Sequence, residues 1–244
     1  MWCHSLEAGQ DKGNRTGDSM RAEDRIGTFI YSLDQGNTEF LDSLEAECIK
    51  DGVPIIRPQT QSLLKTLLAL VRPAQILEIG TAVGFSALLM SEYAPSFCRI
   101  TTIEKYEKRI PLAKENFARS GRGDRITLLE GDAAEILPAL TGSYDLIFMD
   151  AAKGQYQHFL PDVLRLLRCG GVLVSDNVLQ EGEILESRFA VTRRNRTIHA
   201  RMREYLYVLK HHELLETVIL SDGDGAAVSV KKQEQSGSEP EVKK

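Results

Sequence analysis

The chain has 244 residues, a net charge of −5, 42% hydrophobic and 27% charged residues, a composition typical of one large soluble domain. The negative balance argues against a global basic field for nucleic acid but leaves a local basic patch open. No apolar run reaches the roughly 18 residues of a transmembrane helix, and the N-terminus lacks a signal pattern. The cysteines are scattered without a Cys-x-x-Cys pair, which indicates reduced thiols in a cytoplasmic protein.

The N-terminal third is predicted to be helical. Residues 1–19 are polar and aperiodic, so we expect a disordered extension, and Met20 is an alternative start to Met1. A single domain is predicted over 20–232 and a disordered charged tail over 233–244. Amphipathic periodicity predicts helices over 21–33, 38–50 and 59–71, and the prolines of 53–58 predict an extended segment.

From residue 75 onward, short apolar strands alternate with helices. This pattern predicts an α/β fold with a mostly parallel, seven-stranded sheet, helices on both faces and an antiparallel hairpin at one edge. The predicted strands are 76–79, 99–104, 125–130, 144–150, 171–176, 214–220 and 226–230. The predicted helices are 85–93, 110–120, 133–140, 155–167 and 198–210, with a loop over 177–182.

Parallel sheets bind ligands at the carboxyl ends of their strands, and polar residues gather there. The first strand ends in the glycine-bounded loop 80–84 before a helix, where free backbone N–H groups can meet a polar cofactor. A bare Gly-x-x-x-Gly is as often structural, but Glu104 follows where βαβ folds place a ribose-binding carboxylate. The spacing is not the dinucleotide Gly-x-Gly-x-x-Gly, so we do not predict NAD.

Two further strand ends carry oxygen donors. Asp150, Asp176 and Asn177 should lie close together and would suit Mg²⁺ or another hard divalent cation, although by position alone the two aspartates are more simply explained as helix caps and turn formers. Beside a cation, Lys153 would lose its proton more readily and could act as a general base; the alternative is a solvated surface lysine. Asp132 could cap the next helix or hold an adenine amino group.

These motifs together resemble the class I S-adenosylmethionine (SAM) dependent O-methyltransferases, in the cation-dependent group of catechol and caffeoyl-CoA enzymes. The resemblance spans about residues 53–232 and implies a Rossmann-like methyltransferase fold with extra N-terminal helices. It rests on 78–86, 102–104, 131–133, 149–153 and 175–177. Within the group, the chain is most similar to bacterial tRNA 5-hydroxyuridine methyltransferases. The residues that carry this similarity are 150–157, 176–179, Gly182, Arg193, Arg194, 223–225 and 231–232.

The resemblance implies roles for the matched residues and a homodimer. Glu104 would bind the ribose, and Asp150 would border the cofactor and act in catalysis with the base Lys153. The methionine part would meet Ile56, Glu78, Gly80 and Ser86; the adenine would meet Asp132 and Ala133; Mg²⁺ would be held by Asp150, Asp176 and Asn177.

The acceptor is not determined by the metal site, because a catechol and a 5-hydroxyuridine both offer two neighbouring oxygens. Residues 185–210 hold seven basic and two acidic residues, a local charge of +5. Arg193, Arg194 and Arg196 could contact the phosphates of a tRNA anticodon loop, or form a solvated face. We therefore expect methylation of wobble 5-hydroxyuridine to 5-methoxyuridine, with a small catechol or phenol as the alternative acceptor. A regulatory module without catalysis and an oxidoreductase are less well supported.

Overall fold

The computed structural model describes residues 27–233, except 188, 189 and 194 and the side chain of Glu181. The predictions for residues 1–26, Arg188, Arg194 and 234–244 lie outside the described residues. The chain divides into two compact units, one ending at Gly36 and one beginning at Asn37. The single domain over residues 20–232 stays a prediction. In the first unit, residues 27–32 are helical. Within the described residues, no helix is long and apolar enough to span a membrane.

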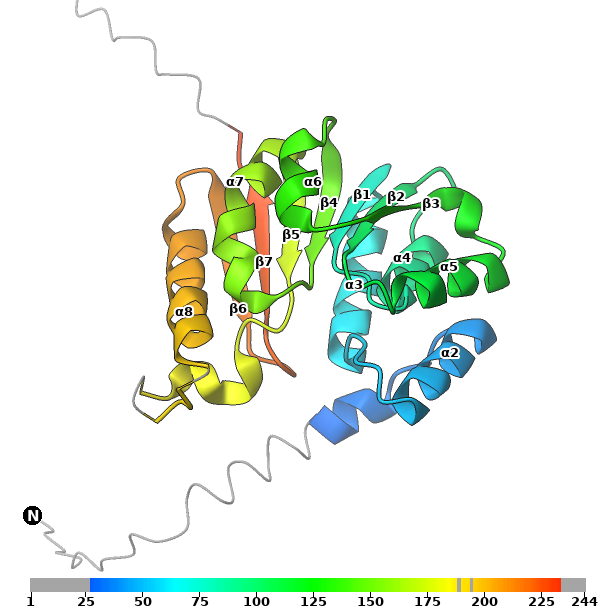
Figure 1. Cartoon of the computed structure of the whole chain (residues 1–244), viewed down its shortest axis with the longest axis horizontal. Helices are drawn as coiled ribbons and strands as arrows, with labels where there is room; N and C mark the ends of the chain where they lie inside the picture. Colours follow the sequence, from blue (N-terminus) through cyan, green and yellow to red (C-terminus); the bar gives the residue numbers. More distant parts are fainter. Residues whose placement is uncertain (1–26, 188–189, 194, 234–244) are drawn as a thin grey trace, which may run out of the picture. The chain divides into compact units, whose positions relative to one another are not determined.

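The second unit is built on one seven-stranded sheet with the order β3-β2-β1-β4-β5-β7-β6 (Figure 1). The predicted mostly parallel sheet is confirmed, because only the pairs β5–β7 and β6–β7 are antiparallel. The strands are β1 (Gln75–Ile79), β2 (Arg99–Glu104), β3 (Ile126–Glu130), β4 (Tyr144–Met149), β5 (Leu167–Ser175), β6 (Leu215–Leu220) and β7 (Ala226–Lys231).

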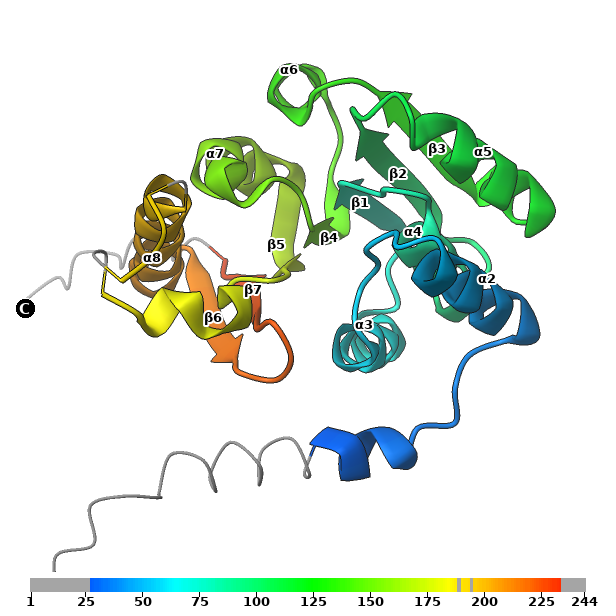
Figure 2. The same cartoon turned by 60° about the horizontal axis from the view of Figure 1, so that its bottom comes forward.

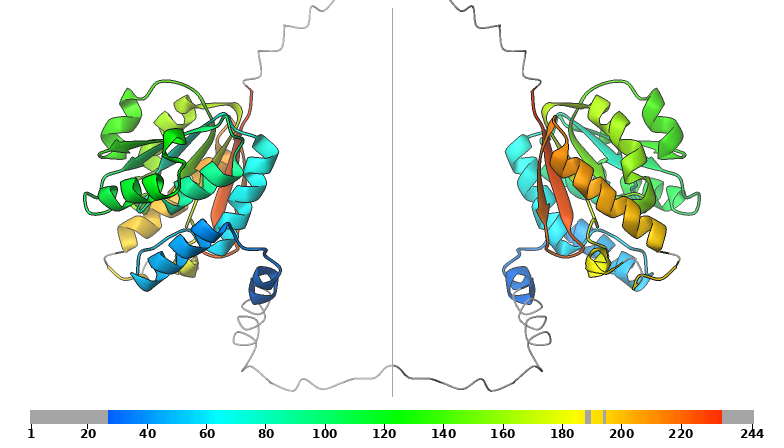
Figure 3. Two further views of the ribbon diagram at one scale, coloured as in Figure 1. Left: turned by 90° about the vertical axis from the view of Figure 1, so that its right-hand side faces the viewer. Right: turned by 90° about the vertical axis from the view of Figure 1, so that its left-hand side faces the viewer.

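Helices cover both faces of the sheet, as Figures 2 and 3 show. One face carries α2 (Glu39–Lys50), α3 (Pro58–Val71), α4 (Phe85–Tyr93) and α5 (Ile110–Arg119). The other carries α6 (Ala133–Ala139), α7 (Tyr156–Leu166) and α8 (Arg196–His211). A hydrophobic core lies on each face of the sheet, and successive strand residues pack into opposite cores. Ile76 packs into the first core and Leu77 into the second. Burial of both faces explains why the strands read as apolar runs.

Several boundaries differ from the predictions. β5 begins at Leu167 rather than at 171. Its first residue pairs with Tyr144 of β4, and the register between the two strands shifts before the next pair, Leu146 with Val172. The predicted loop 177–182 contains part of a 3-10 helix, η3 (Gln180–Leu185). Pro58 begins α3 instead of ending an extended segment, since a proline lacks only an N–H that the first helical turn leaves unpaired. Arg125 lies in a short 3-10 helix, η1 (Gly123–Arg125), rather than in β3.

Candidate active site

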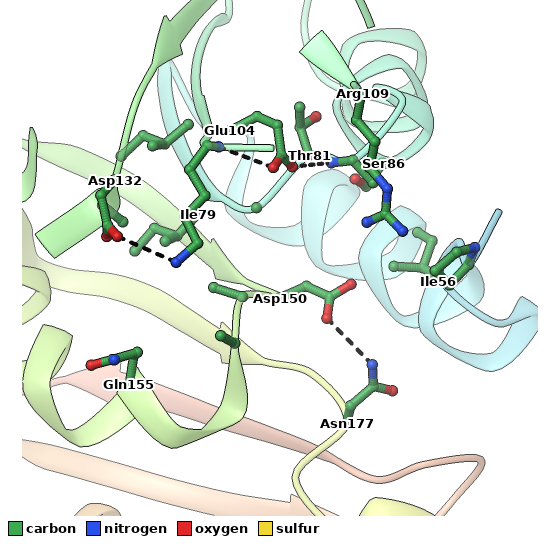
Figure 4. Close-up of a pocket in the computed structure, with 18 of the residues that line it drawn as sticks. Ile56, Ile79, Thr81, Ser86, Glu104, Arg109, Asp132, Asp150, Gln155 and Asn177 are labelled. Atoms are coloured by element: carbon green, nitrogen blue, oxygen red, sulfur yellow. Dashed lines mark hydrogen bonds and ion pairs between the residues drawn. The ribbon is translucent and has the colours of Figure 1, made fainter. Parts of the chain in front are cut away.

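A pocket of about 330 Å³ lies at the carboxyl ends of β1, β2, β3 and β4. Neighbouring parallel strands point the same way, so the residues that follow them share one edge of the sheet. Figure 4 shows Asp132 and Gln155 at one end of this pocket, Glu104 in its wall, and Asp150 with Asn177 at another side. The lining also includes six other predicted or adjacent residues: Ile56, Gly80, Thr81, Ser86, Ala133 and Phe159.

Gly80 lets the backbone of the first loop approach the end of β4. Its φ is +94°, and a Cβ at this position would lie 2.4 Å from the carbonyl oxygen of Asp150. An alanine would therefore clash with backbone that cannot move aside, so the position requires glycine. The following residues place Ser86 and the first turn of α4 against the pocket.

Glu78 is fully buried and is not among the residues that line the pocket. Its Oε2 accepts a hydrogen bond from Thr102 Oγ1 at 2.5 Å. Burial raises the pKa of this carboxyl, and hydrogen bonds from Ser86, Thr102 and Thr81 oppose that rise. The predicted contact of Glu78 with a cofactor would therefore be indirect, through the side chains that Glu78 fixes.

Glu104 is held in one orientation by the backbone around it. Its Oε2 accepts from Ala82 N at 2.7 Å, and its Oε1 accepts from Lys105 N at 3.0 Å and Tyr106 N at 2.8 Å. These three N–H groups come from the loops after β1 and β2. A carboxylate has about four acceptor positions, so about one remains to accept a hydrogen bond from a ribose hydroxyl.

Asp132 caps helix α6, as one of the two predictions for it stated, and it also lines the pocket. Its Oδ1 accepts from Ala134 N at 2.9 Å, which caps α6. Its Oδ2 pairs with Lys105 Nζ at 3.2 Å. The capping hydrogen bond from Ala134 N lowers the pKa of Asp132, burial opposes this, and the Lys105 contact lowers the pKa further, so this side of the pocket keeps an acceptor.

The ends of β4 and β5 bring Asp150, Asp176 and Asn177 together. Asn177, which has a positive φ of 58°, donates from Nδ2 to Asp150 Oδ1 at 3.3 Å. Asp176 Oδ1 accepts from Asn177 N at 2.9 Å and from Thr60 Oγ1 at 3.1 Å. Neither aspartate caps a regular helix, so the capping alternative explains Asp132 but not this pair.

The electrostatics of this pair favour a positive charge between the carboxylates. Burial raises the pKa of Asp150 to about 7, and the charges of Asp176 and Glu78 add to the rise. Burial also raises the pKa of Asp176, against the hydrogen bonds from Asn177 N and Thr60. Two carboxylates with one amide are the oxygen donors that a hard divalent cation prefers.

Lys153 begins the 3-10 helix η2 (Lys153–Gln155), directly after the β4 end. It is half-buried and is not among the residues that line the pocket. Its positive charge lowers the pKa of both Asp150 and Asp176, which places it near the two carboxylates. Arg201 of α8 donates to the carbonyl of the next residue, Gly154, at 3.0 Å and so holds this segment.

The basic segment is partly structural. Arg193 is exposed, and Arg196 donates from Nε to Val191 O at 3.2 Å while remaining half-exposed. Arg203 and Lys210 donate to the carbonyls of Ile184 and Thr217 at 2.8 and 2.6 Å. Thus some of the positive charges that the sequence grouped together stabilise the packing of α8.

Comparison with known proteins identifies the family of the chain. The model of the O-methyltransferase family matches residues 32–232. The chain belongs to the O-methyltransferase family. Catechol O-methyltransferases from Niastella koreensis and Mycobacterium tuberculosis are each 35% identical to it, over 55% and 53% of this chain. These alignments span only 64% and 60% of the two relatives.

A solved structure supports the same relationship. A Staphylococcus aureus protein provisionally named caffeoyl-CoA O-methyltransferase is 30% identical, with a TM-score of 0.79 over 85% of this chain and 99% of the other. The pocket of the present chain therefore lies on a fold that O-methyltransferases share.

Sequence reasoning missed several residues of the site. Thr60 and Arg109 come from helix starts far along the chain, and neither has a motif of its own. Lys105 directly follows Glu104, so its position after a strand end could have indicated it. Gln155 and Phe159 line the same pocket as Asp132, the residue predicted to contact adenine. The position of Gly154 and Gln155 directly after Lys153 could have indicated them.

Proposed function

We propose that this protein is a SAM-dependent O-methyltransferase that uses a divalent cation and methylates 5-hydroxyuridine in the anticodon loop of tRNA. The observation that carries the proposal is a single pocket that joins Asp132 and Glu104 to the Asp150–Asn177 pair. The arrangement offers one region for an adenosine and, beside it, a set of oxygen ligands for an acceptor. The homodimer and the cytoplasmic location remain predictions.

The residues fit SAM. The volume of about 330 Å³ is adequate for a molecule of this size class, and the lining combines apolar side chains with a few fixed polar groups. Glu104 faces the ribose position with its carboxylate fixed by three backbone N–H groups. Ala133 and Phe159 offer an apolar surface for adenine beside the acceptor Asp132.

The residues also fit a divalent cation. Asp150, Asp176 and Asn177 would hold it, since two buried carboxylates lie near each other with Lys153 as the cation that acts on both. When bound, the cation would orient two neighbouring acceptor oxygens and make the hydroxyl more acidic. Lys153 would be replaced by the divalent cation as the positive charge beside the carboxylates, so that its Nζ without the extra proton would accept the hydroxyl proton. Ser86, Ile56 and the Gly80 backbone would fix the methionine part so that the methyl group faces the acceptor oxygen, and this positioning would supply most of the rate gain.

The proposal of tRNA as the acceptor is supported by the basic residues after η3, because the metal ligands would suit a catechol equally well. Arg201 of α8 bonds to Gly154, so the basic segment that begins after η3 is joined to the segment that carries Lys153. Under this proposal the tRNA phosphates would contact Arg193, Arg196 and Arg201, of which Arg193 and Arg201 are exposed. An anticodon loop is single-stranded, and its wobble base can be placed in a pocket without breaking a duplex. The catechol O-methyltransferases among the relatives make a small catechol the alternative acceptor.

The test compares both acceptors with labelled SAM and a salt series. We expect transfer to tRNA that carries 5-hydroxyuridine, and a steep fall of apparent affinity with salt. Replacing Arg193 and Arg194 together with alanine should raise KM for this tRNA and lower the log–log salt slope by about one for each lost phosphate contact. A control that removes the exposed Lys50 and Arg99 changes the net charge equally and should leave the slope unchanged.

One result would contradict the tRNA assignment, and another would contradict the role given to the arginines. One is a wild-type enzyme that ignores the tRNA and methylates a catechol, which makes the small molecule the acceptor. The other is an Arg193/Arg194 variant with the wild-type salt slope, which makes these arginines a solvated face.

A further inference from the structure

Arg109 is a cation in the pocket lining, and it has no carboxylate partner among the residues that the structure describes. The charged lining residues are Glu104, Lys105, Arg109, Asp132 and Asp150. Lys105 pairs with Asp132 at 3.2 Å. Within the described part of the chain, no hydrogen bond or ion pair engages the guanidinium of Arg109. A pocket with three carboxylates thus keeps one guanidinium whose five N–H donors are unused.

The position of Arg109 is nevertheless well defined. Its guanidinium carbon lies 5.5 Å from the centre of the Tyr106 ring, a cation–π contact. Its backbone N donates to Tyr106 O at 2.8 Å, and its carbonyl accepts from Ala113 N at 2.9 Å at the start of α5. The half-buried side chain is therefore restrained at its base and on one face, while its N–H edge stays available.

The side chain extends toward one particular end of the pocket. In Figure 4 it reaches toward Ser86 and Ile56, away from Asp132 and Gln155. Under the proposed function, the Asp132 end takes the adenine and Glu104 takes the ribose. The Ser86 and Ile56 end is then left for the amino-acid part of SAM.

We infer that Arg109 binds the α-carboxylate of SAM, an inference that rests on the proposed function. The sulfonium and ammonium groups of SAM are positive and suit a pocket with three carboxylates. Its carboxylate is the one group that such a pocket would repel, and an unpaired guanidinium matches it with charge-assisted, geometrically matched hydrogen bonds. Arg109 would thereby recognise SAM by its amino-acid end and reject adenosine thioethers that lack a carboxylate.

Calorimetry with three ligands tests this inference. The ligands are S-adenosylhomocysteine, its decarboxylated analogue and 5′-methylthioadenosine, titrated into wild type, Arg109→Met, Arg109→Lys and the control Lys108→Met. Methionine keeps the apolar stem of arginine, and Lys108 is an exposed neighbouring cation outside the pocket lining. Arg109→Met should weaken S-adenosylhomocysteine binding by about tenfold to a hundredfold, the usual effect of losing hydrogen bonds to a charged group.

The two ligands without a carboxylate should bind Arg109→Met within about twofold of wild type, by the same reasoning. Arg109→Lys should retain part of the affinity for S-adenosylhomocysteine, and Lys108→Met should retain all of it. Equal weakening of all three ligands by Arg109→Met would overturn the inference, because the arginine would then act by packing.

The remaining outcomes separate this inference from the proposed function. If wild type binds S-adenosylhomocysteine and Arg109→Met binds it equally well, the Arg109 assignment is wrong and the cofactor assignment stands. If that variant instead shows only a raised KM for tRNA, Arg109 contacts the acceptor phosphate and the inference is overturned. If wild type binds neither S-adenosylhomocysteine nor SAM, both assignments fail.

Discussion

Replacing Asp150 with asparagine should stabilise the metal-free protein at alkaline pH. Asp150 lies near Asp176, and burial, with the charges of Asp176 and Glu78, raises its pKa from 3.8 to about 7. The difference of about 3 corresponds to at most about 4 kcal/mol of unfolding free energy. Because the side chain borders an open pocket that screens part of this effect, we expect about 2 kcal/mol.

The sign follows from where the proton is bound. Below about pH 4 both the folded and the unfolded states hold the proton of Asp150, so the group has no effect on stability. Between about pH 4 and 7 the unfolded state loses the proton first, so the folded state becomes progressively less stable as the pH rises. Above pH 7 the full penalty is present. Asparagine carries no such charge and removes the penalty.

The assay is thermal unfolding in EDTA across a pH series. At pH 8 the Asp150→Asn variant should unfold about 4–8 °C above wild type, the shift that about 2 kcal/mol produces in a domain of this size. Near pH 4 the difference should vanish. An exposed aspartate of η1, Asp124, provides the control, because Asp124→Asn removes a charge without a buried carboxylate neighbour.

Addition of Mg²⁺ gives a second readout in the same experiment. At pH 8 the cation should raise the unfolding temperature of wild type far more than that of Asp150→Asn, since binding to the folded state alone stabilises it. An Asp150→Asn variant that is less stable than wild type at pH 8 in EDTA would refute the argument, because the buried carboxylate would then be compensated within the protein.

Three further predictions concern the cofactor, the metal and the loop. Glu104→Ala should weaken SAM binding at least about tenfold by calorimetry, since the ribose loses its acceptor; unchanged affinity would remove Glu104 from the site. EDTA or Asp176→Ala should abolish methyl transfer while SAM binding persists, and full turnover in EDTA would exclude the cation from the reaction. Gly80→Ala should lower the unfolding free energy by about 2–3 kcal/mol, because its Cβ would lie 2.4 Å from Asp150 O. Gly52→Ala, also at positive φ but with no atom within 4 Å, should cost only about 1 kcal/mol; equal losses would show that the clash is relieved.

The sequence by itself determined the succession of elements and the edge of the sheet that carries the site. Runs of four to seven mostly apolar residues that end at a glycine or an acid predicted strands, and these runs appear as β1 to β4 with small boundary differences. The acids at their ends, such as Glu104 and Asp150, follow from the same local pattern. Local propensity and periodicity act over a few residues, so a single sequence contains this information.

The tertiary structure alone decided which distant residues meet these acids. Thr60 reaches Asp176 across 116 positions in the sequence, and Ala82 donates to Glu104 across 22. Both contacts depend on the strand order and on how the helices pack over the ends of the sheet. Strand order and helix packing are in turn determined by the burial of apolar residues that are far apart in the sequence. Arg109 belongs to the same class: nothing in its local pattern distinguishes it from the exposed Lys108, and only the folded chain gives it a place in the pocket.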